Sequence, residues 1–116
     1  MLNVTAPDDI IYHLYTNDIS PSTGDDLTDF VQCTDTAYHP IEVLGTSWTV
    51  STVNGISAAV ANEIKFNFAS GVSIYGYYTS NHDETLLLWG ERFENAPLLW
   101  PQNGGNLTFD PYVALD

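Results

Sequence analysis

The chain has 116 residues and a formal net charge of -13, and 44% of its residues are hydrophobic. This content of core-forming residues is too high for a disordered chain, and the length is that of one ordinary domain. Nucleic acid and anionic membranes are poor partners, because Lys65 and Arg92 are the only cations beside 15 acidic residues. We therefore expect a single domain over residues 1–116, with no membrane-spanning segment.

The N-terminal third predicts one strand and one short helix. Ile10–Tyr15 is rich in β-branched and aromatic residues and stops at the turn-forming segment Asn17–Pro21, which is typical of a strand. Cap residues and acids then precede Leu27, Phe30 and Val31, which recur at helical spacing. We expect about two helical turns there.

Period-two alternation begins after Ile41 and predicts short strands. One segment ends at Asn54-Gly55, a dipeptide typical of a tight hairpin turn. Further on, Ile64, Phe66 and Phe68 alternate with polar residues, so we expect these three side chains to face the core.

A second hairpin is predicted from Val72–Thr79 and Thr85–Phe93, joined by the loop Ser80–Glu84. Within it we expect Val72, Ile74 and Tyr78 on one face and Tyr75 and Tyr77 on the other, with Gly76 marking a bulge or a close backbone approach.

Prolines and glycines predict an irregular loop over residues 95–106, followed by a last strand at Leu107–Phe109. Short strands separated by turn signals favour an all-β fold, an antiparallel β-sandwich or jelly-roll-like domain with one short helix.

Catalytic and metal-binding motifs are missing from the sequence. His13, His39 and His82 lie far apart and form no spaced ligand motif, and no Gly-x-Ser-x-Gly pattern marks a nucleophile. We expect no enzymatic activity, no cofactor and no metal. Cys33, the only cysteine, is predicted to be a small buried residue without a disulfide.

Acidic residues gather at Asp25, Asp26, Asp29 and Asp35, where a calcium site has to be weighed. Their spacing does not match an EF-hand loop, and charges at the start of a helix explain them better.

Aromatic and apolar residues near the second hairpin and the following loop are the candidates for an interface: Tyr75, Tyr77, Trp89, Arg92, Leu98, Leu99 and Trp100. Such side chains could fill a pocket on a partner or stack on sugars, or a second sheet could cover them. Trp100, between two prolines, is the favoured anchor, and a core plug is its alternative. We expect the Arg92 guanidinium to find a carboxylate partner.

Four short motifs resemble small proteins encoded by tailed bacteriophages: Tyr15-Thr16-Asn17-Asp18-Ile19-Ser20-Pro21, Asp29-Phe30, Ile74-Tyr75-Gly76-Tyr77-Tyr78 and Leu88-Trp89-Gly90-Glu91-Arg92-Phe93. The resemblance implies a virion component, such as a capsid decoration or cement protein or a head or tail accessory protein. It would reside in the virion, and in the host cytoplasm during assembly.

On this basis we expect a non-enzymatic decoration protein that binds the major capsid protein or another virion protein, as a homo-oligomer with a trimer favoured. The alternative is a carbohydrate- or receptor-binding module of a virion.

Overall fold

The computed structural model describes residues 9–53 and 55–114, and these are almost entirely β-structure. The strands are β1 (Ile10–Tyr15), β2 (Ile41–Val43), β3 (Thr49–Val53), β4 (Ile56–Val60), β5 (Ile64–Phe68), β6 (Val72–Ile74), β7 (Gly76–Asn81), β8 (Leu87–Arg92), β9 (Leu98–Trp100), β10 (Gly105–Phe109) and β11 (Tyr112–Ala114). Two 3-10 turns, η1 (Leu27–Asp29) and η2 (Gly45–Ser47), are the helical elements of the described residues, and neither has the length to cross a membrane.

The first layer is an antiparallel sheet in the order β2-β1-β7-β8. Strand β6 directly precedes the inner strand β7 in the chain and extends it at one end. Strand β8 pairs with β7, and β9 pairs with β6. The amide of Phe93 donates to the carbonyl of Tyr75 at 2.9 Å, which carries the ladder across the break between the two pairs. Strands β8 and β9 therefore form one interrupted edge strand.

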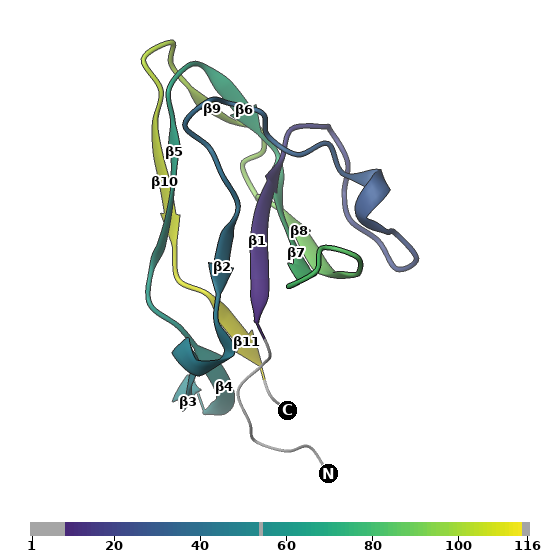
Figure 1. The fold of residues 1–116 in the computed structure, drawn as a ribbon, viewed down its shortest axis with the longest axis vertical. Helices are drawn as coiled ribbons and strands as arrows, with labels where there is room; N and C mark the ends of the chain where they lie inside the picture. Colours follow the sequence, from purple (N-terminus) through teal and green to yellow (C-terminus); the bar gives the residue numbers. More distant parts are fainter. Residues whose placement is uncertain (1–8, 54, 115–116) are drawn as a thin grey trace.

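The second layer is built in the same manner from β3, β4, β5, β10 and β11. Strand β11 pairs with β4 and β10 pairs with β5, while β3 adds to the other side of β4. In Figure 1 the β5–β10 pair stands beside the β1–β2–β7–β8 sheet, and β3, β4 and β11 gather at the end where the described chain begins and finishes. The predicted all-β, sandwich-like class is confirmed.

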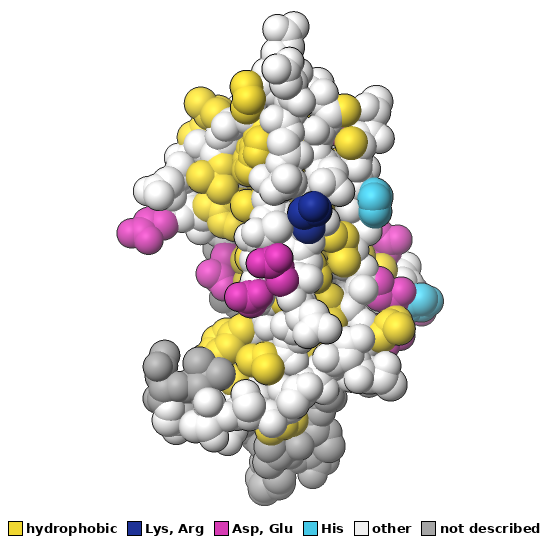
Figure 2. Space-filling view, turned by 90° about the vertical axis from the view of Figure 1, so that its left-hand side faces the viewer, with side chains coloured by type: hydrophobic (Ala, Val, Ile, Leu, Met, Phe, Trp, Pro, Cys, Tyr) yellow, Lys and Arg dark blue, Asp and Glu magenta, His cyan; other side chains and the backbone are white. Residues whose placement is uncertain are grey.

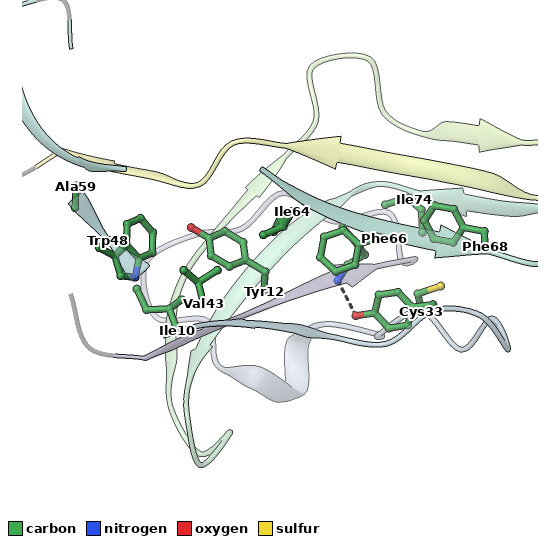
Figure 3. Close-up of a cluster of buried hydrophobic side chains, with 12 residues drawn as sticks. Ile10, Tyr12, Cys33, Val43, Trp48, Ala59, Ile64, Phe66, Phe68 and Ile74 are labelled. Atoms are coloured by element: carbon green, nitrogen blue, oxygen red, sulfur yellow. Dashed lines mark hydrogen bonds between the residues drawn. The ribbon is translucent and has the colours of Figure 1, made fainter. Parts of the chain in front are cut away.

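The main core lies between the two layers, as the side chains in Figure 3 show. Ile64, Phe66 and Phe68 are all buried there, as predicted from their alternation. Aromatic rings join the layers, with Tyr12 and Phe109 at a centroid distance of 5.7 Å and Tyr38 stacked on Phe66 at 5.8 Å. Cys33 is also buried, which confirms its prediction as a small core residue.

A smaller cluster covers the other face of the first sheet. Phe30, on the long connection between β1 and β2, stacks on Tyr78 at 4.4 Å and meets Tyr15 edge-on at 5.1 Å. The predicted helix in this connection is only the 3-10 turn η1, because Asp26 and Asp29 close a capping box around it and extended backbone follows at once at Phe30. The short helix is thus one turn long.

The second predicted hairpin is right near its loop and wrong at the end far from the loop. Strands β7 and β8 pair as expected, but Val72–Ile74 pairs with Leu98–Trp100. The predicted faces are right for Val72, Ile74 and Tyr75 and wrong for Tyr77 and Tyr78, which are exchanged. Val72, Ile74 and Tyr77 pack in the main core, whereas Tyr75 and Tyr78 pack in the outer cluster.

Gly76 explains this shift. A Cβ atom at this position would lie 2.1 Å from the Glu91 carbonyl oxygen and 2.6 Å from the Tyr15 ring, so the backbone approaches its neighbours closely, as the sequence predicts. The strand breaks at Tyr75, and alternation restarts one residue later.

Candidate functional site

The structure separates the seven predicted interface residues into three places. Tyr77 lines an aromatic hollow and accepts a hydrogen bond from Trp89, which is not itself part of the lining. Tyr75 and Arg92 hold the long β1–β2 connection, and Leu98–Trp100 forms β9. The predicted irregular loop over residues 95–106 is wrong at this last segment, because three of its residues complete the ladder with β6.

The aromatic hollow opens between β7, β8 and the β10–β11 corner. It has a volume of about 300 Å³ and is lined by Tyr12, Tyr77, Glu91, Phe93, Phe109, Asp110, Pro111 and Tyr112. The indole of Trp89 donates to the Tyr77 hydroxyl at 3.1 Å, and that hydroxyl donates to Glu91 at 2.9 Å. Burial raises the pKa of Tyr77 to about 12, so this phenol keeps its proton at neutral pH. The lining of the hollow thus contains both aromatic rings and carboxylates that can accept hydrogen bonds.

Arg92 has its carboxylate partner inside the chain, as predicted. Its Nη1 lies 2.6 Å from Asp18 Oδ1 and donates to the Ile19 carbonyl at 3.2 Å. The guanidinium also stands over the Tyr75 ring, 5.4 Å from the ring centroid. These contacts fasten the β1–β2 connection to β8, which gives Tyr75 and Arg92 a structural role.

The side chains of Leu98, Leu99 and Trp100 in β9 do not all face the same way. Trp100 packs on Phe68 with ring centroids 4.7 Å apart, and its indole donates to the Asn106 carbonyl at 3.2 Å. Leu98 is half-buried, whereas Leu99 points outward and is 72% exposed. Trp100 is therefore better described as part of the core than as an interface anchor. Of the three residues of β9, Leu99 is the one that a partner could contact.

A second exposed apolar group lies at the start of β8. Thr79 pairs with Trp89 and Ser80 with Leu87, so Leu88 is the extra residue of a bulge. Leu86 and Leu88 are 58% and 39% exposed. A groove of about 540 Å³ runs between residues 87–90 and the segment 21–25. Sequence reasoning missed this groove, although the run of three leucines from Leu86 was its visible signal.

A serine and a histidine meet inside the molecule. Ser80 Oγ lies 2.8 Å from His13 Nε2, and Gln32 Oε1 lies 2.7 Å from His13 Nδ1. Both Ser80 and His13 are buried, and burial lowers the pKa of His13. A nucleophile needs contact with its substrate, so we read this pair as a core hydrogen-bond network.

The acidic residues weighed for calcium serve as turn caps. Asp26 and Asp29 cap η1, and Asp25 accepts from the Ser22 amide at 2.8 Å. Asp35 accepts hydrogen bonds from Ala37, Ala69 and Ser70, and those from Ser70 and Ala69 lower the pKa of its carboxyl to about 2. Each carboxylate thus has backbone partners of its own.

A different group of charged residues lies on the outer face of the first sheet, at the end where β1 begins. Asp9, Glu42 and His82 bring one ligand atom each to within 4.8 Å of one another. The Glu42 carboxylate contacts His82 Nδ1 and raises the pKa of this imidazole. Sequence reasoning missed this cluster, because its members come from three separate segments and match no spacing motif.

Comparison with known proteins places the chain in no family: no family model, no curated protein and no solved structure matches it.

Proposed function

We propose that this chain is a non-catalytic structural protein of a virion, a capsid decoration or cement protein that binds the capsid surface and stabilises it. The single observation that carries the proposal is the interrupted edge strand β8–β9, which exposes leucines at its two ends. The phage-like motifs of the sequence support the virion setting.

The apolar side chains of this edge favour a protein partner. Leu86, Leu88 and Leu99 all keep more than a third of their surface in water. Burying such a side chain fully is worth roughly 1.5 to 3 kcal/mol, so covering the three would contribute several kcal/mol to docking. The β8 bulge and the adjoining groove give this edge a shape that a flat strand lacks.

Charge favours the capsid protein as the occupant of the edge. The chain carries a net charge of -13, so two copies repel one another wherever their acidic faces approach. Figure 2 shows one such face, where carboxylates lie below and to the left of a cationic side chain and apolar side chains are exposed among them. A neutral or basic capsid surface meets no such repulsion. Neighbouring copies, with a trimer as the favoured arrangement, would then be held in place mainly by the capsid lattice, while salt screens the repulsion between them.

The experiment that tests this proposal is quantitative mass spectrometry of purified virions. We expect the chain in a fixed ratio to the major capsid protein, with many copies per particle. Finding the chain only in the lysate of infected cells, and in no purified particle, would contradict the proposal.

A second candidate, a carbohydrate- or receptor-binding module, is favoured by the aromatic hollow alone. Its Tyr and Phe rings could stack on sugars while Glu91 and Asp110 accept hydrogen bonds from hydroxyl groups. Nuclear magnetic resonance titration with host-surface glycans tests it. Shifts confined to the hollow, and lost in Tyr112→Ala, would favour this candidate, since Tyr112 is an exposed wall of the hollow.

A further inference from the structure

The register of the first sheet brings Asp9, Glu42 and His82 to one face. Ile11 of β1 pairs with Glu42 on one side, and Ile10 pairs with Asn81 on the other side. Asp9 and His82 are the next residues beyond this last pair, and they continue its register although neither belongs to a strand. Directly paired residues of an antiparallel sheet point to the same face, and so do alternate residues along β1. All three side chains therefore share the outer face.

Two contacts order this cluster in advance. The Gly45 amide donates to Asp9 Oδ1 at 2.7 Å, which holds that carboxylate in place. Glu42 contacts His82 Nδ1, so the imidazole already faces the carboxylates. An open hollow of about 350 Å³, lined by Asp9, Asn81, His82 and Asp83, adjoins the cluster. There is room beside the ligands for solvent.

The donor set and its spacing fit a small divalent cation. Ligand bonds of roughly 2.0 to 2.2 Å in tetrahedral geometry put ligand atoms about 3.4 Å apart. The present atoms lie within 4.8 Å of one another, and the His82 and Glu42 side chains are 65% and 29% exposed. Rotations of these side chains would set this spacing, which also requires the Glu42 oxygen and His82 Nδ1, now in hydrogen-bond contact, to move apart.

We propose that Asp9, Glu42 and His82 form a binding site for a divalent first-row transition metal, with zinc as the best fit. An imidazole nitrogen among carboxylates favours such metals, whereas calcium and magnesium prefer oxygen ligands throughout. Three protein ligands leave the remaining position to water. The sequence alone predicts no metal, because the three ligands are far apart in the sequence and only the fold brings them together.

Bound metal would tie three segments together: the residue before β1, the middle of β2 and the turn after β7. Because a metal that binds only the folded state stabilises it, zinc should raise the melting temperature of the protein. This effect is independent of any capsid partner.

The test is calorimetric titration of the untagged protein with zinc chloride, paired with thermal melting. We expect one zinc ion per chain and a melting temperature that rises with zinc. Asp9→Asn and Glu42→Gln remove a charged ligand and keep an acceptor for their present hydrogen bonds, and each should weaken binding about tenfold or more. His82→Ala should do the same. Glu63→Gln is the matched control, because it removes an equal charge from an exposed position outside the cluster.

Diffuse attraction by an acidic surface would give the opposite pattern. Equal weakening by Glu63→Gln and Glu42→Gln would overturn the proposal. So would calcium binding as tight as zinc binding, or zinc binding that His82→Ala leaves unchanged. Circular dichroism of each variant without metal confirms that the fold is intact, since all three ligands lie at the surface.

Discussion

Ser80 Oγ and His13 Nε2 lie 2.8 Å apart on the face of the β1–β7 pair that the long β1–β2 connection covers. With His13 Nδ1–H donating to Gln32 Oε1, Nε2 is the acceptor for the Ser80 hydroxyl. Gln32 Oε1 also accepts from the Tyr38 hydroxyl at 2.8 Å. The network thus joins the connection to both central strands, and its arrangement resembles a catalytic pair only in its distance.

Removing the Ser80 hydroxyl should therefore lower stability. In Ser80→Ala the His13 acceptor loses its partner in a buried place, at a cost of about 1 to 3 kcal/mol of unfolding free energy. Urea denaturation measures this loss, with the exposed Ser51→Ala as the control. A fluorophosphonate probe should label neither protein. Labelling of the wild type that disappears in Ser80→Ala would contradict the structural role.

His13 also predicts a pH dependence of stability. Burial lowers the pKa of His13 in the folded protein, so below a pH of about 6.5 the unfolded chain takes up a proton that the folded chain resists. Stability should be complete above that pH and fall as the pH drops toward 5, by at most about 1.4 kcal/mol per pH unit from this group.

Urea midpoints of wild type and His13→Gln, measured from pH 7.5 to pH 5, test this dependence. Other titrating groups are common to both proteins, so the slope of the difference between them belongs to His13. Parallel curves would show that His13 makes no contribution in this window.

Trp100 and Leu99 should differ sharply although they are neighbours. Trp100→Ala removes a ring packed on Phe68 and should cost about 2 to 4 kcal/mol of unfolding free energy. Leu99→Ala truncates a side chain that lies mostly in water and should change stability by less than about 0.5 kcal/mol. Thermal melting of both variants gives the comparison. An unchanged melting temperature in Trp100→Ala would restore Trp100 as an anchor.

Gly76→Ala should be the most damaging of these substitutions. The new methyl group would meet the Glu91 carbonyl and the buried Tyr15 ring, so β8 or β1 would have to move away from β7. We expect a loss above about 3 kcal/mol or failure to accumulate folded protein. Gly24→Ala is the control, since its site has positive φ but open space, and it should cost only about 1 kcal/mol. Equal effects of the two substitutions would mean that β7 and β8 are less closely packed than we describe.

Local pattern was sufficient to predict much of the fold. The strand Ile10–Tyr15, the alternation of Ile64, Phe66 and Phe68, and the close approach at Gly76 follow from period-two spacing and turn chemistry. The break at Tyr75 could not be predicted in the same way, because the one-residue shift is fixed by the partner strands on both sides. Pairing of β9 with β6 was hidden for the same reason, since a three-residue strand between prolines has almost no pattern of its own.

The candidate residues show a similar division. Composition pointed to aromatic and apolar side chains, and Leu99 does face solvent, but Arg92 and Trp100 are occupied by contacts within the chain. The cluster of Asp9, Glu42 and His82 depends on strand register, which joins residues distant in sequence. Spacing motifs find ligands that share a segment, and these three do not.

The most direct measurement of the central claim is the affinity of edge variants for capsid shells that lack the chain, determined by co-sedimentation. Leu88→Asn and Leu99→Asn change exposed side chains of the β8–β9 edge, and Leu44→Asn changes an exposed leucine outside that edge. We predict that the double variant Leu88→Asn with Leu99→Asn binds about tenfold more weakly or worse with an unchanged melting temperature, while Leu44→Asn binds within about twofold of the wild type. Wild-type affinity of the double variant, or equal weakening by Leu44→Asn, would contradict the proposal that this edge docks on the capsid.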